Sequence, residues 1–144
     1  HRRLQYTFWR DIEHVHGLRA EAERLLEMVR LQRQAYSLAA EMSYSAQRAL
    51  ELAMTLASNP KVILLDEPMA GMSSEETQHT IALIREVTRG RALLLVEHDM
   101  DVVFSLAERI SVLVYGQVIA SGEPATIRAN AAVREAYLGE EVGA

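Results

Sequence analysis

The sequence predicts an α/β domain with parallel strands, preceded by a purely helical segment. Two short apolar runs, at 62–65 and 92–96, have the length of buried strands. Helical patterns alternate with these runs, and a strand–helix–strand–helix–strand order is typical of a sheet with right-handed crossovers. Before the first run, the only periodic patterns are the three- and four-residue apolar spacings of helices, and residues 1–16 have no clear period.

The composition excludes several classes of protein. The 144 residues are enough for one compact domain with a core. The net charge of −5 argues against nucleic acid as a partner, because phosphate binding draws on clustered Lys and Arg. The absence of cysteine excludes disulfides, thiolate nucleophiles and cysteine-based zinc sites. No apolar run reaches the length of about 18 residues that a membrane-spanning helix needs.

The first helices are predicted from apolar spacing and from capping residues. Apolar residues recur at steps of three and four over 18–31, which indicates one amphipathic helix, and 32–41 is predicted to be a connection. Ser43 stands where a helix N-cap would lie. The helix that it opens should end before Pro60, because proline disfavours helical geometry in the preceding residue.

The first apolar run, within 61–66, is a continuous one, and such a run is typical of a central parallel strand covered on both faces. Ser73 is predicted to cap the next helix, which reaches about Arg89 and is ended by Gly90. A second strand follows at 92–96.

The remaining elements are short. Gly116 lies between two apolar segments and predicts a hairpin of the third and fourth strands. The predicted ranges are a helix at 100–107, strands at 109–115 and 117–120, and helices at about 123–129 and 131–138.

Two adjacent carboxylates carry the first chemical signal. Asp66 and Glu67 follow the first strand directly, and ligands of open α/β sheets bind at the carboxyl ends of the strands. Carboxylates beside a buried strand are costly unless a cation, water or substrate meets them. The simpler interpretation is a plain strand followed by an acidic turn.

Two further segments add to this signal. His98 follows the second strand, in the sequence Leu93 to Asp99 (LLLVEHD). A histidine in such a position is more often structural than catalytic. Upstream, Met42 to Arg48 (MSYSAQR) reads by itself as a capped helix start.

Taken together and in this order, the motifs resemble those of ABC-transporter ATP-binding subunits. Val62 to Pro68 (VILLDEP) resembles the Walker B motif, and His98 resembles the switch histidine of the H-loop. The resemblance implies that Asp66 helps to hold Mg²⁺ through water, that Glu67 is the general base that polarises the attacking water, and that His98 contacts the γ-phosphate of ATP. These roles suit phosphoryl transfer, which depends on positioning and charge stabilisation.

The resemblance extends to two contact segments. Gly71, Met72 and Ser73 stand in the place of the D-loop, which implies contact with a partner subunit, although Gly71 is equally well a turn glycine. Met42 to Arg48 is similar to the ABC signature, which implies that Ser43, Ser45 and Gln47 bind ATP held mainly by the partner subunit.

The signature segment departs from its common form. Ser45 replaces a glycine and Ala46 replaces the usual Gln or Glu. A Cβ at 45 hinders close approach of the backbone to a phosphate, which puts turnover in doubt.

The family implies a P-loop NTPase core, and we expect two parts in this chain. Residues 1–58 are predicted to be part of the helical subdomain with the signature, and 59–144 the C-terminal part of the α/β ATPase core. The D-loop, the H-loop and the ending from Arg134 to Glu140 resemble branched-chain amino-acid importers in particular. Urea-type importer subunits and lipopolysaccharide-export ATPases resemble this set too.

Partners and location follow from the resemblance. It implies a second ATP-binding subunit, identical or different, and membrane permease subunits, with a solute-binding protein acting indirectly. The implied location is the cytoplasm, peripheral on the inner face of the cell membrane. ATP and Mg²⁺ are the implied ligands.

The phosphate-binding loop of the family has no match here. The pattern G-x-x-x-x-G-K-[ST] is not found, and the only lysine, Lys61, enters the first strand. The chain begins with His1, so we expect a C-terminal fragment that binds ATP weakly or not at all and does not hydrolyse it. A sheet that lacks its neighbouring strands should leave an edge and an apolar face uncovered, which favours self-association.

Two alternatives stay open. A catalytically silent dimerisation module is favoured by the altered signature and the unmatched phosphate loop. An ABC-type ATPase outside transport is disfavoured by the acidic, compact chain, which has no long basic or coiled-coil insertion.

Overall fold

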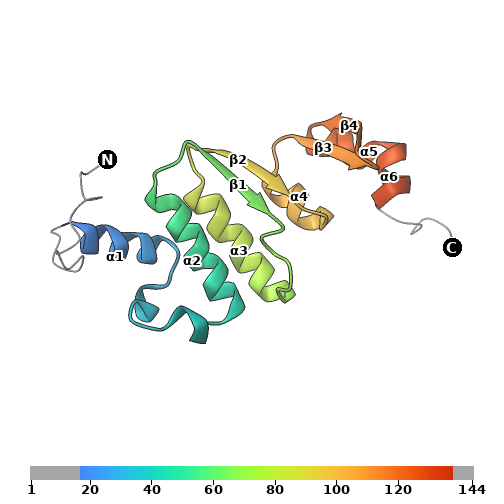
Figure 1. The fold of residues 1–144 in the computed structure, drawn as a ribbon. Helices are drawn as coiled ribbons and strands as arrows, with labels where there is room; N and C mark the ends of the chain where they lie inside the picture. Colours follow the sequence, from blue (N-terminus) through green and yellow to red (C-terminus); the bar gives the residue numbers. More distant parts are fainter. Residues whose placement is uncertain (1–16, 138–144) are drawn as a thin grey trace. The chain divides into compact units, whose positions relative to one another are not determined.

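The computed structural model describes residues 17–137, and the order of its helices and strands is the one predicted (Figure 1). The end of the predicted last helix, at 138, lies outside the described residues, as do residue 1, where the first predicted domain starts, and residue 144, where the second ends. The elements are α1 (Leu18–Met28), η2 (Gln32–Gln34), η3 (Ala39–Glu41), α2 (Tyr44–Ala57), β1 (Val62–Asp66), α3 (Ser74–Val87), β2 (Ala92–Val96), α4 (Met100–Leu106), β3 (Ile110–Val114), β4 (Gln117–Gly122), α5 (Pro124–Ala129) and α6 (Ala131–Tyr137).

The described residues fall into two compact units, and each is described by itself. The first contains the described residues up to Ile63 together with Glu86–Ala92. The second contains Leu64–Arg85 and the described residues from Leu93 onward. No helix among the described residues is long and apolar enough to cross a membrane.

The first unit is built on the contact between α1 and α2. Helix α2 ends where the sequence predicts, since it gives way to Asn59, at φ 49°, before Pro60, whereas α1 ends at Met28, before the predicted end at 31. The Arg91 guanidinium holds this corner by donating to the carbonyl of Pro60 (3.2 Å), the side chain of Asn59 (3.2 Å) and the carbonyl of Val87 (2.9 Å). The buried residues of the first unit include Leu25, Val29, Leu31, Leu52, Ala53 and Leu56.

Strands β1 and β2 form a two-stranded parallel sheet (Figure 1). The N–H of Ala92 donates to the carbonyl of Lys61 (2.9 Å) at one end, and the N–H of Glu67 donates to the carbonyl of Val96 (2.9 Å) at the other. Both partners advance along the sequence in the same direction, which is the parallel pattern.

One face of this sheet is open to solvent, so the prediction of a first strand covered on both faces is wrong for the described structure. Ile63 is 1% exposed, whereas Leu64 is 68% exposed. Successive side chains of a strand point to opposite faces, so an apolar run supplies two apolar faces whether or not both are covered. The expected uncovered apolar face is therefore confirmed, and its exposed side chains are Val62, Leu64, Leu94 and Val96.

The predicted hairpin is confirmed. Strands β3 and β4 pair antiparallel around a two-residue turn, with a register irregularity after Val112. Tyr115 (φ 48°) and Gly116 (φ 77°) both have positive φ, as a type I′ turn requires. The order of elements suggested that the third strand would continue the parallel series. Within the described residues it pairs with β4 and with neither strand of the parallel sheet.

The hairpin shares a small core with the last helices. Ile110 and Val112 of β3 pack with Ile127 of α5 and Val133 of α6. The hydroxyl of Tyr137 donates to the carbonyl of Leu113, which fixes the end of α6 on the hairpin.

Candidate functional site

Two side chains predicted to be catalytic meet at the carboxyl ends of β1 and β2. The Nδ1 of His98 lies 3.3 Å from the Oε1 of Glu67. Their side chains are 71% and 53% exposed, so both are open to a ligand from solvent. An exposed pair of this kind contributes little to stability.

The backbone of Glu67 is held in an uncommon conformation. Its φ is 43°, in the left-handed region that residues other than glycine rarely adopt. Two hydrogen bonds fix it, one from its N–H to the carbonyl of Val96 (2.9 Å) and one from the N–H of Ala70 to its own carbonyl (3.1 Å). Backbone strain of this kind is found preferentially at functional sites.

Glu97 joins the two loops, and sequence reasoning did not single it out. Its Oε1 accepts from the N–H of Met69 (3.3 Å), and its Oε2 accepts from the N–H of His98 (3.2 Å). One carboxylate thus bridges the turn after Glu67 and the residue that bears the imidazole. The available signal was a charged residue directly before His98 at the end of a strand.

Asp66 ends β1 and is exposed, as is Glu67. The cost expected of carboxylates beside a buried strand is therefore avoided, because water reaches both. Among the residues that the structure describes, no group of three or more His, Asp or Glu side chains could hold a metal ion by itself. One exposed carboxylate fits Mg²⁺, which usually keeps several waters and binds through one or two carboxylates and substrate phosphates.

The segment after Glu67 turns tightly into α3. Gly71 has φ 77°, which glycine adopts freely, so the turn role of this residue is supported. Ser73 caps α3 as predicted: its N–H (3.0 Å) and hydroxyl (2.8 Å) both donate to the carboxylate of Glu76, whose N–H lies 3.4 Å from the Ser73 hydroxyl. This reciprocal pattern is a capping box. Contact of this segment with a partner stays a prediction.

The signature-like segment lies at the start of α2, in the first unit. The Ser43 hydroxyl accepts from the N–H of Ala46 at 3.3 Å, which confirms the predicted cap, and lies 3.2 Å from the Ser45 hydroxyl. Two hydroxyls therefore stand at a helix N-terminus, where backbone N–H groups and the helix dipole favour an anion. Ala46 is only 9% exposed, so the position that usually carries Gln or Glu faces inward here.

Gln47 faces back toward the connection that precedes the helix. Its Nε2 donates to the carbonyls of Ala39 (3.0 Å) and Met42 (3.2 Å). These bonds give it a structural role in this conformation, while its predicted contact with ATP is untested.

Arg48 brings a positive charge beside this segment. Its guanidinium binds the carboxylate of Glu51 (2.7 Å) and the hydroxyl of Tyr44, and lies over the Tyr44 ring. The bond to Glu51 first, and that to Tyr44 second, raise the pKa of Arg48 above its ordinary value. Arg48 thus places a guanidinium, which is cationic in proteins, one residue beyond Gln47.

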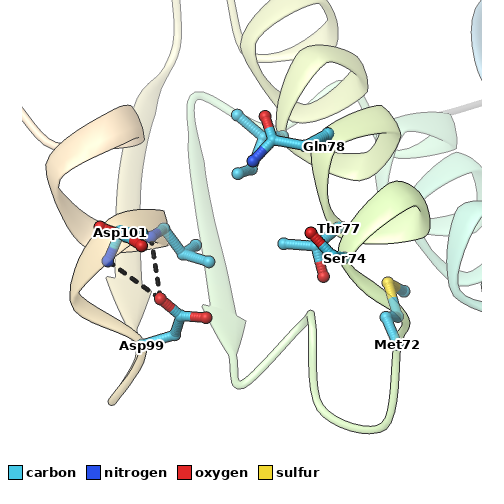
Figure 2. A pocket seen from close by; sticks show the side chains of 8 residues that line it. Met72, Ser74, Thr77, Gln78, Asp99 and Asp101 are labelled. Atoms are coloured by element: carbon cyan, nitrogen blue, oxygen red, sulfur yellow. Dashed lines mark hydrogen bonds between the residues drawn. The ribbon is translucent and has the colours of Figure 1, made fainter.

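A polar pocket lies between α3 and the start of α4 (Figure 2). Asp99 forms one wall, where its Oδ1 caps α4 by accepting from the N–H groups of Asp101 (2.9 Å) and Val102 (3.3 Å). Ser74, Thr77 and Gln78 of α3 form the other wall. An aspartate just before a helix is a recognisable N-cap, and it sets the direction in which the chain leaves His98.

The second unit carries two groups of the kinds that acid–base chemistry uses. An exposed carboxylate and an imidazole, held at the ends of adjacent parallel strands, can polarise a water and meet an anionic group on the same substrate. The first unit, taken by itself, has a helix start suited to an anion.

Two sequence-family profiles match the chain. The profile described as "ABC transporter" matches residues 4–70, and the profile described as "Branched-chain amino acid ATP-binding cassette transporter" matches residues 117–143. The chain is 38% identical over 130 residues to the high-affinity branched-chain amino acid transport ATP-binding protein LivG of Escherichia coli, covering 85% of this chain and 51% of LivG. It is 40% identical over 121 residues to BraF of Pseudomonas aeruginosa, a protein of the same description, covering 83% of this chain and 48% of BraF.

Solved structures give the same result for the fold. The ADP-bound form of MJ1267, an ATP-binding cassette of an ABC transporter, superposes with a TM-score of 0.74 at 28% identity, over 84% of this chain and 50% of that one. A further relative by sequence is the lipopolysaccharide export ATP-binding protein LptB of Haemophilus influenzae, which is 32% identical over 124 residues, covering 85% of this chain and 52% of LptB. The chain thus spans about half the length of the relatives that it matches.

Proposed function

The chain is homologous to the ATP-binding proteins of ABC transporters, and from this premise we propose that it is part of an ATPase subunit that powers solute import. Branched-chain amino acids are the proposed solute class, because LivG and BraF are described as transporting them and the profile over 117–143 bears the same description. LptB, at 32% identity, is described with a different cargo, so the solute is the finer part of the proposal.

One observation carries the proposal of hydrolysis. Glu67 Oε1 and His98 Nδ1 lie 3.3 Å apart at the carboxyl ends of two parallel strands, each on its own loop. This is the end of an open α/β sheet at which substrates bind. A base and a phosphate contact are thereby available on one small surface.

The proposed chemistry divides the reaction between these residues. The Glu67 carboxylate takes a proton from water as the water oxygen attacks the γ-phosphorus of ATP and the bond to the bridging oxygen breaks. The His98 imidazole donates a hydrogen bond to a γ-phosphate oxygen, where charge is concentrated. Asp66 would hold Mg²⁺ through water, and this ion supplies positive charge to the phosphates.

The signature segment is proposed to act on a different nucleotide. Ser43, Ser45 and the start of α2 would bind the γ-phosphate of ATP held mainly by a second ATP-binding subunit, with Gly71 to Ser73 touching that subunit. Their support is the pair of hydroxyls 3.2 Å apart at a helix N-terminus. Membrane permease subunits are the proposed further partners, with location at the inner face of the cell membrane.

Calorimetry with ATP and Mg²⁺ tests the proposal. It compares this chain with the protein extended upstream to its natural start, because no phosphate-binding loop pattern is found within these 144 residues. We expect saturable binding and phosphate release only from the extended protein. Saturable micromolar binding by this chain alone would contradict the assignment of the phosphate loop to another segment.

A catalytically silent module is the second candidate, and one observation favours it. Ser45 replaces a glycine in the signature, and Ala46 faces inward in place of a polar residue. If the extended protein dimerises with an active ATP-binding subunit but releases no phosphate by itself, this candidate is correct. Phosphate release by the extended protein alone rules it out.

A further inference from the structure

We propose that Glu97 is a positioning residue, whose carboxylate ties the loop after β1 to the loop after β2 and so holds the His98 imidazole against Glu67. The inference rests on the proposed function for its catalytic consequence, but its structural part stands on contacts within the second unit. In this proposal Glu97 acts through His98 and Glu67 and does not itself contact the substrate.

The two oxygens of Glu97 serve two different loops. Oε1 accepts from the N–H of Met69, and Oε2 accepts from the N–H of His98, at 3.3 and 3.2 Å. Met69 is only 6% exposed, so a lost partner for its N–H is not readily replaced by water. The Glu97 side chain itself is half-buried.

A second hydrogen bond joins the same two loops. The carbonyl of Val96, the residue before Glu97, accepts from the N–H of Glu67 at 2.9 Å. Two residues at the end of β2 therefore hydrogen-bond to the turn after β1: Val96 binds the N–H of Glu67, before Pro68, and Glu97 binds the N–H of Met69, after it. Of these two residues, only Glu97 also binds the N–H of His98. The Glu97 carboxylate thus links the loop that bears Glu67 to the loop that bears His98.

Geometry of this kind matters for catalysis. Displacement of a reacting group by about 1 Å can reduce a rate by about 100-fold even when the changed residue touches no substrate. Side chains that fix catalytic groups act through such placement. Loss of the brace should therefore lower kcat and leave the KM for ATP nearly unchanged.

Two variants separate the bonds. Glu97→Gln keeps the shape but replaces one carboxylate oxygen by an NH₂ group, which cannot accept, so one of the two bonds is lost. Glu97→Ala removes both. The matched control is Glu108→Gln, at an exposed glutamate of the same unit.

Amide hydrogen exchange followed by NMR tests the brace in this chain. We expect exchange at Met69 to rise at least roughly tenfold in Glu97→Ala, because a hydrogen bond to a charged acceptor is lost, with a smaller or one-sided rise in Glu97→Gln. Exchange at the β3–β4 hairpin should stay unchanged, which distinguishes a local effect from unfolding. Unchanged exchange at Met69 in Glu97→Ala would overturn the inference.

Phosphate release by the extended protein tests the consequence. We expect Glu97→Ala to lower kcat by roughly 10- to 100-fold with KM for ATP within about twofold, and Glu108→Gln to change neither. A wild-type protein that hydrolyses ATP together with a fully active Glu97→Ala variant contradicts a positioning role. If the wild type itself is inactive, the proposed function fails, whereas the exchange experiment still decides whether Glu97 holds the two loops.

Discussion

The loops that follow β1 and β2 and the segment that opens α2 stand in contrast. In the loops, residue types and geometry agree: Glu67 and His98 meet, and Glu97 braces both of their loops. At the start of α2 the helix cap is well formed by Ser43, but a glycine position carries Ser45. The difference teaches that the residues of a motif that shape the backbone can be separated from those that bind a ligand. The α2 start has the helix cap of the motif but not the glycine that would let the backbone approach a phosphate.

The largest expected effect comes from Glu67. Glu67→Gln in the protein extended upstream should lower phosphate release by roughly 1000-fold and leave ATP binding intact, because an amide cannot accept the proton of the attacking water. Release is measured in single turnover and binding by calorimetry. Glu75→Gln, in the first turn of α3, is the control and should be neutral. If the Glu67→Gln variant turned over ATP at the wild-type rate, Glu67 would not be the general base.

His98 should have the next largest effect. His98→Ala removes one donor to the γ-phosphate, and loss of one such donor costs about 100-fold in kcat. The same single-turnover assay applies. His79→Ala, at an exposed histidine of α3, serves as the control. Equal effects of the two changes would indicate a general perturbation and not a phosphate contact.

A change at the α2 start sharpens the comparison in the opposite direction. Ser45→Gly removes the Cβ and should raise phosphate release by about fivefold, the factor expected from one added backbone hydrogen bond to phosphate. The same change should lower the free energy of unfolding by up to about 1 kcal/mol, since glycine is unfavourable in a helix. Urea unfolding and phosphate release on one preparation measure both. No gain in rate, with the stability loss present, would favour the silent module.

The smallest effect concerns the cap alone. Ser43→Ala should lower the free energy of unfolding of this chain by about 1 kcal/mol, because the N–H of Ala46 loses its acceptor. Ser43→Asp restores a cap and should restore stability, but its negative charge should weaken ATP binding at this helix start. If Ser43→Asp binds ATP as well as the wild type does in the assembled dimer, the segment does not hold a phosphate.

Much of the fold could be predicted because its signals are local. Apolar runs locate β1 and β2, Ser43 and Ser73 mark helix starts through their side-chain bonds, and Gly116 marks the hairpin. For the coverage of the sheet the sequence favoured two opposite expectations, a strand covered on both faces and an uncovered apolar face, because an apolar strand looks alike whether one or both of its faces are packed.

The candidate site divides in the same way. The proximity of Glu67 and His98 follows from two strand ends at one edge of a parallel sheet, which sequence order suggests. The bridge formed by Glu97 depends on where two backbone N–H groups point, and no residue pattern records that direction. The positive φ of Glu67 is likewise set by its surroundings and not by its own preference.

The backbone of Glu67 has a consequence for anyone who would engineer this protein. At φ 43°, glycine relieves a steric cost of about 1–3 kcal/mol, against its own entropic cost of about 0.5–1 kcal/mol. A library selected for thermal resistance alone will therefore enrich glycine at 67 and discard the proposed base with it. At this position the more stable sequence and the proposed catalytic sequence differ, so a selection must reward turnover together with heat tolerance.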